Sequence, residues 1–300
     1  HEIYLKPFEM VVKNTGILAV MSTYNSWNHV PNSASHYLLT DILRGQWGFK
    51  GYVYSDWGAI EMLKTLHFTA RNSSEAAMQA ISAGLDVEAS SECYPFLKTL
   101  IEKGQFDEEI LNTAVRRVLF SKFAMGLFED PYGERYKGRG RHTPESIQLA
   151  KKIADESTVL LKNENRLLPL DVNRIKSIAV IGPNADQVQF GDYSWSRSNK
   201  DGVTPLQGIK DRAGDKVTIR YAKGCSLTSL ETSGIAEAVE AARQSDVAII
   251  FGGSASAALA RDYKSSTCGE GFDLNDLNLT GAQSQLIREV YQTGTPVVLV

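Results

Sequence analysis

The chain has 300 residues, of which 43% are hydrophobic, and a formal net charge of −3 at pH 7. This length allows two domains with hydrophobic cores of their own. The weakly acidic balance, without a basic stripe, argues against a nucleic-acid or polyanion partner, and no apolar run reaches the roughly 18 residues of a membrane span.

Strand and helix patterns alternate over residues 1–129. The apolar run 17–21 predicts a strand that leads into Tyr24, and the run 52–54 predicts another that leads into Asp56. Such alternation favours a parallel sheet or a barrel, although a closed barrel needs about eight strands. The other predictions for this part are helices over 36–47, 73–82 with Ser73 as N-cap, 94–103 and 107–125, and a strand over 84–88.

A change in composition marks a second unit. Residues 130–142 combine proline, glycine and basic residues, which is typical of a linker, and Thr143 and Pro144 then form the N-cap and first position of a helix. Near-continuous apolar runs after it indicate a buried parallel sheet over 143–300. The predicted strands are 178–181, 217–219, 247–251 and 296–300, and the predicted helices include 233–243 and 281–292.

Cysteine and histidine usage gives no sign of a metal site. Cys93, Cys225 and Cys268 are far apart and the histidines are scattered, so neither zinc-ligand spacing nor a disulfide framework is present. We therefore expect no metal and no cofactor. The first residues lack the basic and apolar segments of a signal peptide, but they also lack an initiator methionine. The sequence therefore does not identify the cellular compartment of the protein.

Asp56 is the first candidate for chemistry. It ends an apolar strand, which is where barrel enzymes carry catalytic groups, and the indole of Trp57 suits the apolar face of a sugar ring. Tyr24 ends the preceding strand and adds a polar group. Taken by position alone, Asp56 as the cap of the following helix is the favoured interpretation.

Glu270 is the second candidate. It lies in a long polar loop, 252–276, and such a loop inside an α/β unit is uncommon unless it forms a lid or a site. Glycosidic cleavage requires two carboxylates from different elements. Spacing does not show that Asp56 and Glu270 meet, and by itself it favours a solvated surface loop. The other charged residues of the loop are Arg261, Asp262, Lys264, Asp273 and Asp276.

Three further features are weaker signals. The glycine turns after 178–181 and 247–251 do not complete a phosphate-binding motif, so nucleotide binding is disfavoured. Ser55 and Ser254 lack the G-x-S-x-G context of a serine hydrolase. Asp86 and Glu88 alternate along one strand, and a structural ion pair is the expected role of at least one of them.

A series of short blocks extends across nearly the whole chain. Among them are Ser-Asp-Trp at 55–57 inside 51–58, and Gly-Glu-Gly-Phe-Asp at 269–273. The other blocks are 7–9, 20–25, 39–49, 83–88, 115–118, 126–132, 157–164, 168–170, 179–186, 204–206 and 277–279 with Gln283. In this order the blocks resemble glycoside hydrolase family 3, and together they are far more specific than any one of them.

This resemblance implies the C-terminal part of a (β/α)₈ TIM-like barrel over 1–129, followed by an incomplete α/β sandwich over 143–300. Asp56 matches the family's nucleophile and Glu270 its general acid/base, although the loop of Glu270 varies in length among relatives. Leu274 stands where many relatives have arginine, which loosens the local ion pairing. Tyr24 and Trp57 match residues that line the sugar, and we expect Met21 beside them to contact substrate.

The implied activity is that of a retaining exo-β-glycosidase for terminal β-D-glucosyl residues, with β-xylosidase as the alternative. Asp56 needs hydrogen-bond donors to stay ionised, whereas Glu270 must hold a proton and needs partial burial or a negative neighbour. Hydrolysis with retention of the anomeric configuration requires the two carboxyl groups to lie about 5–5.5 Å apart. The 269–273 block argues against the family's β-N-acetylglucosaminidases, which carry the acid/base in a barrel loop.

Family residues that hold the sugar hydroxyls, an Asp, an Arg and a Lys-His pair, belong to earlier barrel strands. We therefore expect this chain to be a fragment that exposes apolar strand edges, aggregates and has little activity alone. A non-catalytic sugar-binding fragment and a nucleotide-binding protein are the competing classes. For the whole protein the resemblance implies a β-linked oligosaccharide or glycoside substrate, a homodimer as one assembly, and a secreted or periplasmic location.

Overall fold

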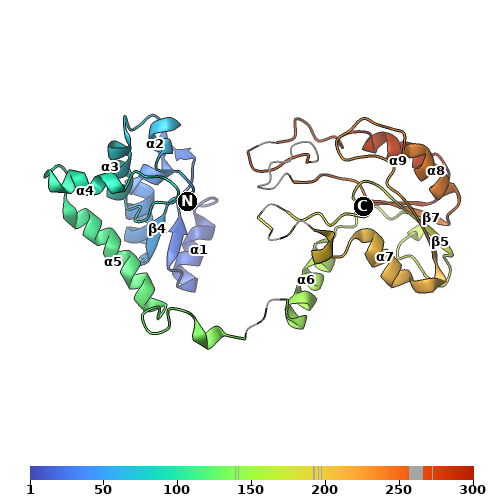
Figure 1. Cartoon of the computed structure of the whole chain (residues 1–300), viewed down its shortest axis with the longest axis horizontal. Coiled ribbons are helices and arrows are strands. Elements are labelled where there is room, and N and C mark those ends of the chain that lie inside the picture. Colours follow the sequence, from blue (N-terminus) through green and yellow to red (C-terminus); the bar gives the residue numbers. More distant parts are fainter. Residues whose placement is uncertain are drawn as a thin grey trace. The chain divides into compact units, whose positions relative to one another are not determined.

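A computed structural model describes residues 1–138, 140, 142–191, 193–194, 196, 198–256, 266–271 and 273–300. The chain forms two compact units, unit 1 (His1–Gln148) and unit 2 (Leu149–Val300), which we describe in turn (Figure 1). The division falls within helix α6 (Pro144–Ser157), and the predicted linker 130–142 stays a prediction. Within the described residues, no helix is both long and apolar enough to cross a membrane.

The central strands of unit 1 are short and parallel. β1 (Ala19–Met21) pairs with β4 (Tyr52–Tyr54), so that Val20 lies opposite Val53. The strand predicted over 84–88 is reduced to one bridge between Tyr54 and Val87. The Val53 amide donates to the Asp86 carboxylate at 2.8 Å. This amide is therefore not available to donate to a backbone carbonyl of residues 84–88, as a longer strand pairing would require.

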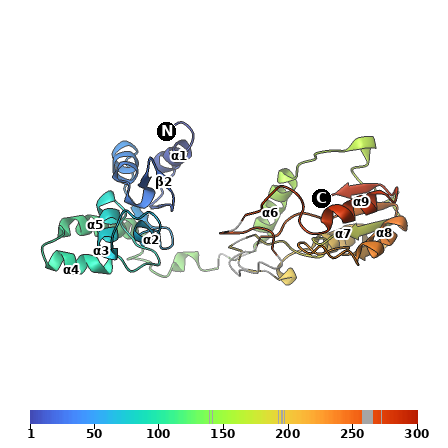
Figure 2. The same ribbon diagram turned by 90° about the horizontal axis from the view of Figure 1, so that it is seen from above.

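Helices bury these strands. Val53 and Leu85 are fully buried, together with Ile60, Leu63 and the alanine-rich face of α3. Figure 2 shows α3, α4 and α5 next to one another. The helices and minor elements of unit 1 are α1 (Lys6–Thr15), η1 (Asn32–Ala34), η2 (Tyr37–Gln46), α2 (Met62–Thr65), α3 (Ser73–Ala83), α4 (Pro95–Glu102), α5 (Glu108–Ala124), η3 (Glu134–Tyr136) and the hairpin β2 (Ser26–Trp27) with β3 (Val30–Pro31).

Most predicted helices of unit 1 are present, with two corrections. The N-cap of α3 is Asn72 rather than Ser73, because the Asn72 side chain accepts the Glu75 amide at 2.9 Å. The helix predicted over 36–47 is the π-helix η2. Thr143 caps α6 as predicted, since its hydroxyl accepts the Ser146 amide at 3.2 Å.

Unit 2 contains a four-stranded parallel sheet in the order β6-β5-β7-β8. The central strands β5 and β7 are buried and apolar, as predicted, whereas the edge strands β6 and β8 are partly exposed. Helices α8 and α9 cover one face and α7 the other, which gives two separate cores (Figure 1). The elements are β5 (Ser177–Ile181), α7 (Pro205–Ala213), β6 (Thr218–Ala222), α8 (Ile235–Arg243), β7 (Val247–Ile250), α9 (Gln283–Tyr291) and β8 (Val297–Leu299), with the short turns η4 (Glu164–Arg166), η5 (Asn199–Asp201) and η6 (Gly214–Lys216).

The strand order places a topological switch point between β5 and β7. From β5 the chain proceeds to β6, and from β7 it proceeds in the opposite direction to β8, so the segments that follow β5 and β7 diverge. Open parallel sheets bind ligands at such a point, outside the carboxyl ends of the strands. The 252–276 loop begins there, directly after β7.

Candidate active site

The Asp56 turn (residues 55–58) follows β4 directly. One carboxylate oxygen of Asp56, Oδ1, accepts the Trp57 amide at 2.7 Å and the Tyr24 hydroxyl at 2.9 Å. Hydrogen bonds from donors favour the ionised form of a carboxylate. The donors that a nucleophilic Asp56 requires are therefore present, and both are on Oδ1.

Tyr24 is held from two sides. Its hydroxyl also contacts the Trp57 carbonyl oxygen at 3.0 Å, and its own carbonyl oxygen accepts from His67 Nε2 at 2.7 Å. His67 follows α2 and was not singled out from the sequence, because nothing in its local pattern indicates a contact with residue 24. The carbonyl partner requires that Nε2 carries the proton.

Two apolar side chains near this turn are open to solvent. Trp57 is 73% exposed, and Met21, the last residue of β1, is 46% exposed. Single exposed apolar side chains are common on protein surfaces, so the position of these two beside the candidate carboxylate is what makes them candidates for ligand contact. An exposed indole next to a carboxylate is the arrangement expected for a sugar site.

Asp86 and Glu88 have structural contacts. The Asp86 carboxylate is buried and pairs with Arg44 at 2.6 Å and Arg117 at 2.8 Å, which confirms the predicted ion pair. Burial lowers the pKa of the Arg44 guanidinium to about 10. Glu88 accepts the amides of Cys93 and Tyr94, each at 2.8 Å, and so fixes the loop that follows the Tyr54–Val87 bridge.

A hollow of about 580 Å³ lies beside the Asp56 turn. Gly58 is part of the Asp56 turn and also lines the hollow. The rest of the lining combines hydroxyl groups, two carboxylates and the half-exposed ring of Phe96. These residues are Glu61, Met62, Thr65, Ser73, Ser90, Ser91, Glu92 and Phe96.

Glu270 lies in unit 2, in the loop after β7. Its side chain is exposed, so the partial burial expected for it is not found within this unit, and its Oε2 accepts the Tyr193 hydroxyl at 2.6 Å. Tyr193 adopts a φ of 62°, which is uncommon for a non-glycine residue and was not predicted. Arg261, Asp262 and Lys264 of the same loop lie outside the described residues.

Both ends of this loop are anchored. On one side, Ser256 and Cys268 form a parallel bridge, and the Thr267 amide donates to the Ala255 carbonyl at 2.8 Å. Next to β7, the fully buried Gln283 accepts the Gly253 amide at 2.9 Å and donates to the Gly253 carbonyl at 3.0 Å. Glu270 lies two residues after the Ser256–Cys268 bridge, and its side chain is exposed.

Groups of three or more His, Cys, Asp or Glu residues that could hold a metal ion are absent from the described part of the chain. Cys93, Cys225 and Cys268 are free thiols.

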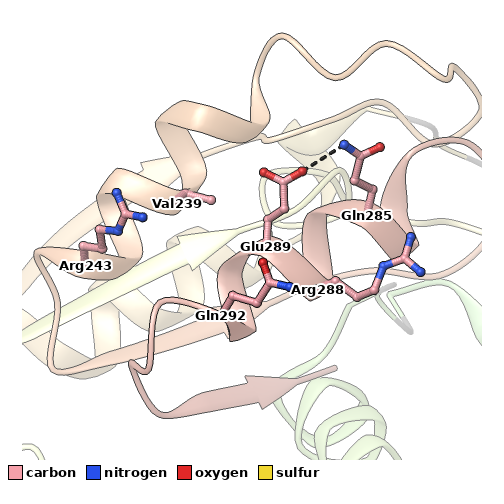
Figure 3. Close-up of a pocket in the computed structure, with 6 residues that line it drawn as sticks. All are labelled: Val239, Arg243, Gln285, Arg288, Glu289 and Gln292. Atoms are coloured by element: carbon pink, nitrogen blue, oxygen red, sulfur yellow. Dashed lines mark hydrogen bonds between the residues drawn. The ribbon is translucent and has the colours of Figure 1, made fainter.

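Another hollow, of about 490 Å³, lies between α8 and α9 and contains none of the candidate residues (Figure 3). Its wall includes Arg243 and Gln292 at the ends of these helices, next to the starts of β7 and β8. The Glu270 loop begins at the opposite ends of the strands. Gln285 donates to Glu289 at 2.8 Å across one turn of α9, so this hollow is a polar surface groove rather than the candidate site.

Both units are α/β, and each carries a candidate carboxylate beyond the carboxyl end of a parallel strand, the position where barrels and open parallel sheets bind their ligands. The particular family follows from matches over most of the chain. Residues 1–120 match the glycosyl hydrolase family 3 N-terminal domain, and residues 158–300 match its C-terminal domain. The chain belongs to glycoside hydrolase family 3.

Similar proteins include both glucosidases and xylosidases. A β-xylosidase from Formosa agariphila is 38% identical to this chain in a match that covers the whole chain and 42% of the relative. A periplasmic β-glucosidase from Salmonella typhimurium is 36% identical in a match that covers 99% of the chain and 41% of the relative. A β-glucosidase structure from Erythrobacter marinus matches 98% of the chain and 42% of its own, with a TM-score of 0.87 and 32% identity. The chain thus spans about two fifths of these proteins.

Proposed function

We propose that the whole protein is a retaining exo-β-glycosidase that removes terminal β-D-glucosyl residues. The observation that carries this proposal is the Asp56 carboxylate, held at the end of β4 by the Tyr24 hydroxyl and the Trp57 amide, beside an exposed indole. The relationship to family 3 β-glucosidases supports it. The periplasmic relative supports a periplasmic or secreted location.

We further infer that unit 1 is the C-terminal part of a (β/α)₈ barrel and that unit 2 begins an α/β sandwich. In support, unit 1 has parallel strands with intervening helices, and the chain covers 42% of a longer β-glucosidase at a TM-score of 0.87. Barrel enzymes place their chemistry beyond the strands' carboxyl ends. Asp56 occupies that position relative to β4.

In the proposed reaction, Asp56 attacks the anomeric carbon while the glycosidic C–O bond breaks and its electron pair goes to the leaving oxygen. Glu270 donates its proton to that oxygen. Glu270 then takes a proton from water, whose oxygen attacks the anomeric carbon and releases Asp56. Because Oδ1 of Asp56 already accepts two hydrogen bonds, we assign the attack to Oδ2.

A β-xylosidase is the second candidate. The observation that favours it is the 38% identity to the Formosa agariphila β-xylosidase. The two candidate activities are distinguished by measuring kcat/KM of the whole protein for an aryl β-glucoside and for an aryl β-xyloside. We expect the glucoside to be preferred, and a preference for the xyloside would replace the proposed substrate but not the mechanism.

The roles of the two carboxylates are tested by substitution in the whole protein. Asp56→Ala is expected to lower kcat on the order of 10⁴-fold or more for every leaving group, because no nucleophile remains. Glu270→Ala is expected to cost about 10²–10⁴-fold with poor leaving groups and far less with an activated dinitrophenyl glycoside, which needs no protonation.

Glu289→Gln is the matched control, since Glu289 is a carboxylate of unit 2 in the groove between α8 and α9. It should leave kcat/KM within about twofold, as expected of a surface substitution. Near wild-type turnover of Asp56→Ala would remove the nucleophile assignment. A loss in Glu270→Ala that is the same for good and poor leaving groups would remove the acid/base assignment.

A further inference from the structure

Ser55 is a buried residue of the Asp56 turn to which the proposed mechanism gives no role. It is 1% exposed and directly precedes Asp56. Its Oγ accepts the Ala89 amide at 2.8 Å. The hydroxyl therefore connects the turn to the neighbouring segment that begins with the Tyr54–Val87 bridge.

Three hydrogen bonds join this turn to residues 87–89. The Ser55 amide donates to the Val87 carbonyl at 2.8 Å, the Ala89 amide donates to Ser55 Oγ at 2.8 Å, and the Gly58 amide donates to the Ala89 carbonyl at 2.9 Å. They lie on both sides of Asp56 in the sequence. The backbone that carries the carboxylate is thus fixed before and after it.

Residues 87–89 are themselves well anchored. Next to Ala89, the Glu88 carboxylate accepts the Ser91 hydroxyl at 2.6 Å and the amides of Cys93 and Tyr94 at 2.8 Å. Charge-assisted bonds of this kind are stronger than neutral ones. Ala89 is therefore a fixed reference point for Ser55.

We infer that Ser55 is a positioning residue that sets the direction of the Asp56 carboxylate through Ala89. This inference rests on the proposed nucleophilic role of Asp56. Without the Ser55 hydroxyl the Ala89 amide loses its acceptor, and an unpaired buried donor is costly enough for the turn or the loop to shift. A misplacement of about 1 Å at a reacting group costs on the order of 10²-fold in rate.

The test compares Ser55→Ala with Ser121→Ala in the whole protein. Ser121 is a fully buried serine of α5 whose hydroxyl donates to the carbonyls of Leu18 and Arg117 at 3.3 and 3.0 Å. Both variants lose one buried hydroxyl of unit 1, and only one of them lies beside Asp56. Thermal unfolding gives the structural effect of each.

The readout is the pre-steady-state release of phenol from an activated aryl β-glucoside, which reports formation of the glycosyl-enzyme. We expect Ser55→Ala to slow this step about 10–100-fold while the substrate concentration for half-saturation changes less than about threefold. Ser121→Ala should stay within about twofold of wild type in both. Equal rate losses in the two variants, or a wild-type rate in Ser55→Ala, would overturn the inference.

Ser55→Cys guards against an alanine variant that does not fold. A thiol sulfur is a weak acceptor of similar shape, so a reduced glycosylation rate is again expected, and a wild-type rate again overturns the inference. Asp56→Ala, run in parallel, separates the two proposals. If Asp56→Ala is active, the proposed function is contradicted. If Asp56→Ala is inactive and Ser55→Ala is fully active, only the role of Ser55 is contradicted.

Discussion

At the residue scale, the two candidate carboxylates are held very differently. Asp56 Oδ1 accepts two donors from within unit 1, while Glu270 is exposed and accepts the Tyr193 hydroxyl within unit 2. A nucleophile benefits from preorganised donors. A proton donor needs surroundings that keep its proton, and for Glu270 these must come from the substrate or from groups beyond its own loop.

A second property at this scale is the buried thiol below the Asp56 turn. Cys93 is fully buried, and its Sγ donates to a Glu61 carboxylate oxygen at 3.2 Å. Burial, helped by the bond to Glu61, raises the pKa of the Cys93 thiol from 9.0 to about 12. The thiol therefore stays protonated in the folded protein at pH values where it ionises in the unfolded chain.

This predicts a loss of stability at alkaline pH. Between pH 9 and 12 the unfolded state releases the Cys93 proton and the folded state retains it, so the free energy of unfolding falls as pH rises, by about 1.4 kcal/mol per pH unit for this group. Below pH 9 the group contributes no slope. Urea unfolding of wild type and Cys93→Ala at pH 8, 9 and 10 measures the difference, with Cys268→Ala as the control thiol.

Groups that do not interact with Cys93 contribute equally to both proteins, so the difference in slope reports Cys93 together with its effect on the neighbouring Tyr94. We expect the slope above pH 9 to be shallower in Cys93→Ala and unchanged in Cys268→Ala. Parallel stability curves for wild type and Cys93→Ala would show that the thiol titrates alike in the folded and unfolded states.

Single residues were predictable from sequence where a local pattern marks them. Asp56 follows an apolar strand, and the pairing of Asp86 with arginines follows from a charge on a buried strand. His67 and Tyr193 were not predictable, because their contacts with Tyr24 and Glu270 join segments 43 and 77 residues apart. Such contacts depend on the tertiary fold and leave no periodic signal.

At the element scale, apolar runs located all four strands of the unit 2 sheet to within a few residues. The central strands β5 and β7 were the clearest, because strands buried on both faces are nearly continuous in apolar residues. The shorter elements of unit 1 were less predictable. Helix α1 has no buried residue, although Val12 packs against the unit 1 core, and the β2–β3 hairpin has two residues in each strand. The 84–88 strand is weakened by the Asp86 side chain.

The close approach of the β5 and β7 ends in the unit 2 sheet depends on one glycine. Gly182 follows β5 with a φ of 116°, and a Cβ there would lie 2.2 Å from the Phe251 carbonyl oxygen. Both the backbone conformation and the close approach exclude a side chain. Gly182 therefore allows the ends of β5 and β7 to come together where the Glu270 loop begins.

Gly182→Ala should lower the free energy of unfolding by about 3 kcal/mol, the sum of backbone strain and overpacking. Gly208→Ala is the control in the same unit. Gly208 lies in α7 and a Cβ there makes only an ordinary contact, so alanine should stabilise by about 0.5–1 kcal/mol. Denaturant unfolding measures both, and a neutral Gly182→Ala would contradict the close approach of the two strand ends.

At the scale of the whole molecule, the candidate carboxylates belong to separate folding units, since Asp56 lies in unit 1 and Glu270 in unit 2. Each unit's hydrophobic core fixes the loop that carries its own candidate carboxylate. The proposed mechanism requires the two carboxyl groups to come together. Strand patterns and residue spacing indicate candidate residues, but they carry no information on the distance between residues of separate units.

The stereochemistry of the product reports that separation. Carboxyl groups about 5–5.5 Å apart leave room only for direct attack by Asp56 and give net retention, whereas a gap of about 6.5–9.5 Å admits a water molecule and gives inversion. We expect proton NMR of the whole protein acting on an aryl β-glucoside to show the β-anomer of glucose first, followed by mutarotation. The α-anomer as first product would mean that the two carboxyl groups lie too far apart for a glycosyl-enzyme to form, and Asp56 would then act as a base toward water instead of as the nucleophile.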